Sequence, residues 1–262
     1  MKKWILILII MPSIAHADGV CDGQDICVWD CAANTQSSCT ATLDKTTNTL
    51  TLTGYGSIKS YPRPYNEERN FYYSEAPWYE YNSNVQTLTL DGNFTSIGNY
   101  TFAHLFSLKK VDLPETLQTI GLASFHDDKN LTDINIPDSV TSIGNYAFSY
   151  LGNTLTSIVV PDEATIGNNA FTSSNISSIY CAKEKEDYCK ARLAASGWSE
   201  EKIGNALKTY QKNGNEYLYK GKFYQSAYDI LSGDYIKKRI YTVDEAEKLS
   251  KPSGNTFKLR YK

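Results

Sequence analysis

The strongest constraint on this chain is internal repetition, which begins at Val85. Apolar residues recur at the first, fourth and sixth positions of successive units, whose starts lie 23, 23, 24 and 21 residues apart. The first positions are Val85, Leu108, Leu131, Leu155 and Ile176. An Ile-Gly pair and then a Phe follow in four units, at Ile97, Ile120, Ile143 and Ile166 and at Phe102, Phe125, Phe148 and Phe171. A period of this length predicts a solenoid, because no unit can bury its apolar side without stacked neighbours.

Each coil is expected to contain one short strand, whose side chains alternate between the core and the outer surface. Proline follows the strand at Pro114, Pro137 and Pro161 and ends it, because proline has no N–H to donate. The glycine after each Ile is expected at a corner with positive φ or at a close backbone approach. The outward strand positions form the first candidate ligand-binding face: Thr87, Thr89, Lys110, Asp112, Asp133, Asn135 and Ser157.

The unit at residues 131–148, LTDINIPDSVTSIGNYAF, resembles the leucine-rich repeats of bacterial BspA-type surface proteins. The resemblance extends upstream through LTLTGYGSIKSY at 50–61 and covers roughly residues 39–189. It implies a leucine-rich-repeat fold in a cell-surface or secreted protein that adheres to host proteins or other microbes. The array is short, with four full units and a partial fifth, and the shortened fourth unit is expected to bend or close the stack.

The first seventeen residues have the order of a secretory signal peptide. Lys2 and Lys3 precede an apolar run over residues 4–14, and Ala15-His16-Ala17 has the small-x-small pattern of a cleavage site. The run is too short to cross a hydrocarbon core of about 30 Å as a stable helix. We therefore expect an exported protein that begins at Asp18 without a membrane span, in the periplasm, at the cell surface or in the medium.

The mature chain is expected to divide into modules of opposite charge. The segment from Asp18 to Cys181 holds seven Lys and Arg against eighteen Asp and Glu, and the remainder holds seventeen against eleven. Such asymmetry suggests separate modules with separate partners. The predicted architecture is a β-rich cap at 18–84, a solenoid at 85–181, a helical cap at 182–212 and a small basic α+β module at 213–262.

Six cysteines in an exported chain favour disulfides. Four of them, Cys21, Cys27, Cys31 and Cys39, permit three pairings, and a zinc site around Cys27 and Cys31 is the alternative. Cys181 takes an inward strand position, and Cys189 lies on a helix expected over residues 184–195. We expect these two cysteines to form a disulfide that seals the last coil.

Several elements are expected outside the repeats. A hairpin is predicted from strands at 39–43 and 50–53, and a second C-terminal helix at 199–210. Strands at 236–241 and 256–261 enclose a helix that opens with a capping box at Thr242 and Glu245 and runs to Leu249.

The stretch from Tyr61 to Tyr81 is unusually aromatic. Its tyrosines form a second candidate binding surface, an aromatic platform for glycans or peptides: Tyr61, Tyr65, Tyr72, Tyr73, Tyr79 and Tyr81. The alternative is packing over the first coil, which we favour for Trp78.

Catalytic motifs are missing from the sequence. The mature chain has two histidines, His104 and His126, at nearly equivalent places in neighbouring coils, with Asp127 and Asp128 adjacent. A metal or acid–base site is conceivable there, but exposed polar turn residues are the commoner explanation. We therefore expect a binding protein with a protein or glycan ligand, and neither an enzyme nor a protein that uses a metal, a cofactor or nucleic acid. The alternative is a structural envelope protein held to anionic surface polymers by its basic C-terminal module.

Overall fold

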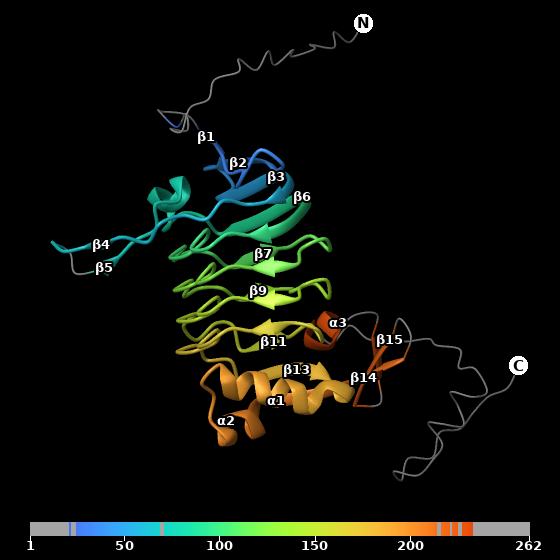
Figure 1. The fold of residues 1–262 in the computed structure, drawn as a ribbon. Helices are drawn as coiled ribbons and strands as arrows, with labels where there is room; N and C mark the ends of the chain where they lie inside the picture. Colours follow the sequence, from blue (N-terminus) through green and yellow to red (C-terminus); the bar gives the residue numbers. More distant parts are fainter. Residues whose placement is uncertain are drawn as a thin grey trace, which may run out of the picture. The chain divides into compact units, whose positions relative to one another are not determined.

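The repeat units form stacked coils whose strands run parallel from one coil to the next (Figure 1). The computed structural model describes residues 21, 25–68, 71–213, 216–220, 222–224 and 227–232. The chain divides into two units after Tyr210. The predicted signal peptide and the elements expected at 236–241, 242–249 and 256–261 lie outside the described residues.

The first full coil contains one long strand, and each later full coil contributes two short strands, where one was predicted. The first ladder consists of β6 (Thr87–Ile97), β7 (Lys110–Asp112) and β9 (Asp133–Ile134), and it follows the predicted strand positions. The second consists of β8 (Thr119–Ile120), β10 (Ser142–Ile143) and β12 (Thr165–Ile166), which also pair in parallel. These two-residue strands precede the repeated glycines and are too short to give an alternation signal in the sequence.

The N-terminal cap joins both ladders. Antiparallel strands β1 (Ile26–Asp30), β2 (Ser38–Asp44) and β3 (Thr49–Ser57) lead into β6, which is parallel to β3. The first part of β6 pairs with β7 and its end with β8, so the sheet forks. Gly54 and Gly92 pair across β3 and β6 at φ of 142° and 148°. A Cβ on Gly92 would lie 2.0 Å from the Gly54 carbonyl oxygen, so side chains are excluded from this bend.

The repeated glycines bring successive coils into close contact. A Cβ on Gly144 would lie 2.6 Å from the carbonyl carbon of Gly121 in the preceding coil. Neither residue has a positive φ, so close approach, and not a left-handed corner, explains the repeated glycine.

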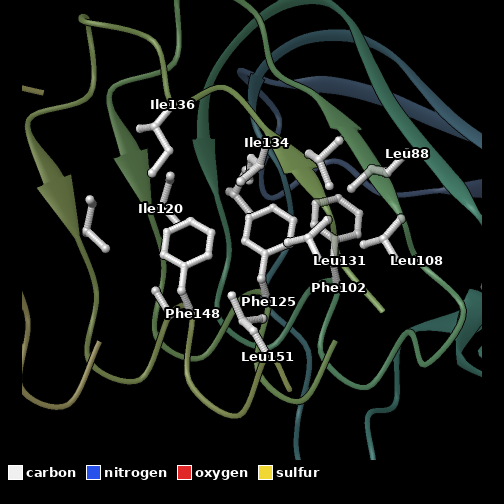
Figure 2. Close-up of a cluster of buried hydrophobic side chains, with 14 of the residues drawn as sticks. Leu88, Phe102, Leu108, Ile120, Phe125, Leu131, Ile134, Ile136, Phe148 and Leu151 are labelled. Carbon is white, nitrogen blue, oxygen red and sulfur yellow. The ribbon is translucent and has the colours of Figure 1, made fainter. Parts of the chain in front are cut away.

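A column of aromatic rings fills the solenoid. Phe102, Phe125, Phe148 and Phe171 are fully buried, and their ring centroids lie 5.6, 5.3 and 5.8 Å apart along the stack. Figure 2 shows three of these rings among the Leu and Ile side chains of the strands. Trp78 extends the column with its ring 5.7 Å from that of Phe102, and its Nε1 donates to the Thr101 carbonyl oxygen at 2.8 Å. The predicted packing of Trp78 over the first coil is confirmed.

Disulfides close both ends of the repeat-containing unit. Cys21 pairs with Cys27 and Cys31 with Cys39. The zinc alternative at Cys27 and Cys31 is therefore wrong, because each thiol is used in a separate disulfide.

The predicted hairpin is formed by β2 and β3, and Asp44 accepts a hydrogen bond from the Thr46 backbone N–H in its turn at 2.8 Å.

The solenoid changes at its fourth unit. The strand β11 (Ser157–Val159) belongs to a second sheet with β13 (Ser178–Ala182) and β14 (Leu207–Asn213). The prediction of a helix over 199–210 is only partly correct. The helix α2 (Glu200–Ala206) ends at Ala206, and β14 begins at the next residue. Ile179 pairs with Leu207, so β14 satisfies the open edge of β13.

The helix α1 (Glu186–Ala195) covers the last coil, and Cys189 on it is joined to the buried Cys181 on β13. Short 3-10 helices occupy Pro77–Tyr81 and Lys183–Lys185. In the second unit the end of β14 pairs with β15 (Glu216–Tyr219), which pairs with β16 (Lys222–Tyr224), and α3 (Ala227–Ser232) follows.

Candidate ligand-binding site

A hairpin arm, formed by residues 62–68 and 71–75, leaves the solenoid between the cap and the first coil. Its strands are β4 (Tyr65–Asn66) and β5 (Phe71–Tyr72), and they extend away from the stacked coils (Figure 1). The base of the arm is fixed by backbone hydrogen bonds, including Glu75 N–H to the Pro62 carbonyl oxygen at 3.1 Å. Ser74 Oγ also donates to the Tyr100 carbonyl oxygen at 3.2 Å. This attachment places Arg63 beside the edge of the coils.

The tyrosines expected to form one platform are divided by the structure. Tyr61 is 7% exposed and its ring lies 5.3 Å from that of Trp78, so it belongs to the core and is unavailable to a ligand. Tyr81 packs against Trp29 at 6.1 Å, under the cap. The single platform that the sequence suggested is therefore not formed by all six residues.

The other four tyrosines lie on or near the arm. Tyr65 and Tyr72 are 45% and 49% exposed, with ring centroids 4.9 Å apart. Tyr73 lies 6.2 Å from Tyr79. Tyr72 and Tyr79 face the hollow described below, which leaves two of the predicted platform residues at the candidate site.

The edge of each coil beside the arm has an unusual backbone. His104, Asp127 and Tyr150 occupy equivalent positions in successive coils and have φ values of 65°, 66° and 60°. Backbone hydrogen bonds join these edges, from His104 N–H to the His126 carbonyl oxygen at 2.8 Å and from Asp127 N–H to that of Ser149 at 2.9 Å. The repeat therefore stacks equivalent polar side chains beside one another. The two histidine rings lie 5.3 Å apart, which confirms the expected proximity.

Arg63 connects the arm to both histidines. Its Nε lies 3.3 Å from His104 Nε2, and its Nη2 lies 3.1 Å from His126 Nε2. A guanidinium can only donate, so both Nε2 atoms accept and each ring carries its proton on Nδ1. His104 Nδ1 is then a donor to Asp127 Oδ2 at 3.2 Å, and His126 Nδ1 is a donor to Ser149 Oγ at 2.6 Å. One tautomer satisfies all four contacts, with both imidazoles neutral.

The electrostatic surroundings of His126 maintain its neutral state. Burial, followed by the positive charge of Arg63, lowers the pKa of His126 to about 4. Burial acts to raise the pKa of Asp127, but hydrogen bonds from His104 and Lys129 hold that pKa below its usual value. Asp127 Oδ1 lies 3.2 Å from Lys129 Nζ. Asp127 is therefore an anion with two partners of its own.

These side chains line an open hollow of about 920 Å³, which we call the arm hollow. Its lining combines aromatic rings with charged and amide groups from the arm and from three coils. The residues are Arg63, Tyr72, Tyr79, Glu80, Asn82, His104, Phe106, His126, Asp127, Lys129 and Tyr150. Ser149 beside His126 is fully buried and donates to the Tyr146 carbonyl oxygen at 2.8 Å, so it supports the turn. The arrangement is suited to binding a ligand through ring faces and fixed polar groups.

Asp128, the other acidic residue suggested beside the histidines, has a separate role. It is fully buried, and its Oδ1 accepts the Leu105 backbone N–H at 2.8 Å. Ser174 accepts the equivalent Leu151 N–H at 3.2 Å in a later coil. Asp128 therefore joins neighbouring coils and is not a lining residue.

The predicted sheet face also exists as an ordered surface. Lys110 lies in register between Thr87 and Asp133, and its Nζ is 3.0 Å from Asp112 Oδ1. Ser157 is the exception, because it lies on β11 in the other sheet. The binding role of this face remains a prediction.

Residues that the sequence did not single out include Arg63, Glu80, Asn82, Phe106, Lys129 and Tyr150. The repeat itself could have identified Tyr150, which lies 23 residues after Asp127. Arg63 lies outside the repeat, and its place at the hollow depends on how the arm attaches.

Comparison with known proteins agrees with this architecture. Residues 78–190 match the family model for the BspA type leucine rich repeat region, in six copies. A leucine-rich repeat protein from Eubacterium ventriosum has 21% identity and a TM-score of 0.51, with 75% of this chain and 48% of that chain covered. The present chain thus spans about half of that structure's length, and the likeness establishes the fold. No curated protein matches the chain in sequence.

Two further solved structures are more distantly similar. A leucine-rich repeat protein from T. pallidum has 21% identity and a TM-score of 0.37, covering 53% of this chain and 67% of that one. A leucine-rich cell surface protein from Faecalibacterium prausnitzii has 17% identity and a TM-score of 0.31, covering 78% of this chain and 60% of that one. None of the described helices is long and apolar enough to cross a membrane.

Proposed function

We propose, from the BspA-type leucine-rich repeat region at residues 78–190, that this is an exported bacterial binding protein. It recognises a ligand at or beyond the cell surface and performs no catalysis. The order of the first seventeen residues supports export, and three disulfides suit an oxidising compartment. The finding that carries the proposal is the arm hollow, where polar and aromatic side chains converge.

The arm hollow is a better ligand site than the sheet face. Its groups are held in place, because Arg63 contacts two histidines that are themselves fixed by Asp127 and Ser149. Preorganised groups lose little conformational entropy when a ligand binds. Tyr150, which is 48% exposed with its ring 5.3 Å from that of His126, supplies an accessible aromatic face. On the sheet face, Lys110 and Asp112 are exposed and satisfy each other.

The experiment compares two tyrosines of one coil. Tyr150 lines the hollow, whereas Tyr146 is 39% exposed outside it, and both have a positive φ. Tyr150→Ala and Tyr146→Ala therefore carry similar backbone costs. Purified protein beginning at Asp18 would be assayed against bacterial surfaces, host extracellular proteins and glycan arrays. We expect Tyr150→Ala to weaken binding of the ligand so identified roughly tenfold or more, and Tyr146→Ala to leave it unchanged. Loss of binding in Lys110→Ala, with Tyr150→Ala unaffected, would place the site on the sheet face instead.

A further inference from the structure

Within the part of the chain that the structure describes, no acidic side chain neutralises the charge of Arg63. Its side-chain hydrogen-bond partners are two imidazoles, and both are neutral in the tautomer that the contacts require. Among the described residues, no carboxylate lies within 4.0 Å of its guanidinium nitrogens. The guanidinium is partly buried and lies 4.5 Å from the Tyr72 ring centroid and 5.9 Å from that of Tyr100. A half-buried cation held rigidly without a counter-ion is suited to an external anion.

The other charges of the hollow have partners or face water. Asp127 is engaged by His104 and Lys129, so its negative charge is balanced by the Lys129 ammonium. Glu80 also lines the hollow, but its side chain is exposed to solvent. The least compensated charge within the hollow is therefore the positive charge of Arg63.

The surfaces around Arg63 suit a ring with one apolar face and a polar rim. Tyr72, Tyr79, Phe106 and Tyr150 provide aromatic faces, and Asn82 provides an amide. A sugar ring packs its C–H face on such aromatics, while its hydroxyl groups need hydrogen-bond partners. A small inorganic anion would use Arg63 but none of these rings.

We propose that the arm hollow binds an acidic saccharide whose carboxylate is held by Arg63. This inference rests on the proposed binding function and specifies its ligand class. The carboxylate accepts from the guanidinium N–H groups that the histidines leave available, and the sugar ring lies against the tyrosines. His104 and His126 act as positioning residues, because they fix the plane of the guanidinium.

The experiment uses matched pairs of oligosaccharides on the full mature chain. Galacturonate, glucuronate and sialic acid oligomers would each be titrated beside their methyl esters, which keep the sugar and remove the charge. We expect at least one acid to bind roughly tenfold or more tightly than its ester. Arg63→Gln should reduce the affinity for that acid to the level of the ester, whereas Arg63→Lys should retain part of the preference. Lys110→Gln is the control, since it removes the same charge on the sheet face.

The wild-type comparison of acid with ester does not depend on any variant folding correctly. Equal affinity for acid and ester throughout the panel would overturn the role of the carboxylate while leaving saccharide binding intact. Binding of dextran sulfate as tightly as the best carboxylated oligomer would show a general anion site and overturn the proposed ligand class. Failure to bind any saccharide, with Tyr150-dependent binding of a protein ligand retained, would refute this inference and leave the proposed function standing.

Discussion

The rings of Phe125 and Phe148 come from residues 23 positions apart and stack with centroids separated by 5.3 Å and planes inclined by 2°. One repeat of 23 residues therefore places equivalent rings of neighbouring coils in direct stacking contact. Phe148 is equally close to the next coil, with its ring 5.8 Å from that of Phe171. Each ring is thus buried only because both neighbouring coils are present.

Phe148→Ala is expected to lower the free energy of unfolding by about 3–5 kcal/mol, because it removes a buried ring and leaves a cavity. Each coil depends on its neighbours, so the loss should spread along this short array. Thermal or denaturant unfolding followed by circular dichroism measures the change. Tyr146→Ala, which removes an exposed ring from the same coil, is the control. An unchanged melting temperature for Phe148→Ala would show that the coil register is wrong.

Asp128→Asn should raise the free energy of unfolding, relative to the unsubstituted protein, by more at pH 7 than at pH 4. Burial raises the pKa of Asp128 well above its usual value of 3.8, so between these two pKa values the folded state keeps the carboxyl protonated while the unfolded chain ionises it. The folded state thus binds the extra proton, and stability falls as pH rises above about 4. Asparagine keeps the acceptor for the Leu105 N–H and cannot ionise. Melting temperatures of both proteins at the two pH values test this, and an equal difference at both would contradict it.

His126 should make the protein less stable in mild acid. Its pKa is about 4 when folded and 6.5 ordinarily, so the unfolded chain binds the proton first as pH falls. The stability associated with neutral His126 is therefore complete above about pH 6.5 and lost progressively toward pH 4, by at most about 3 kcal/mol. The groups around it are Arg63, His104, Asp127 and Lys129. His126→Gln should show a smaller drop in melting temperature between pH 7 and 4.5, and an identical drop would refute the assignment.

Cys181 and Cys189 should be recovered in one linked peptide from non-reduced digests. Replacing both with Ser is expected to cost roughly 2–3 kcal/mol of unfolding free energy, since the disulfide closes a short loop. The change should also expose α1 to proteolysis first, because the disulfide fixes this helix over the last coil. Free thiol at either position in the native, oxidised protein would exclude the cap as described.

The sequence predicted the solenoid and its core because the same apolar positions recur in every unit. It missed β14 because Leu207 to Tyr210 continue a helix-compatible pattern, and only the open edge of β13 makes a strand preferable. The candidate site was harder to predict from the sequence than the solenoid. His104 and His126 could be placed together by the period, but Arg63 reaches them through an arm whose docking depends on tertiary contacts. Burial of Tyr61 likewise follows from its contact with Trp78, which no local pattern indicates.

The central claim, that the ligand occupies the arm hollow, is tested most directly by hydrogen–deuterium exchange with and without the ligand identified in the binding assays. The account predicts slower exchange in the coil edges at residues 100–106, 123–129 and 146–151, together with the base of the arm at 62–66. Amides of β7 and β9 should be unaffected. Protection confined to β6, β7 and β9, with the coil edges unchanged, would contradict the claim and assign binding to the sheet face.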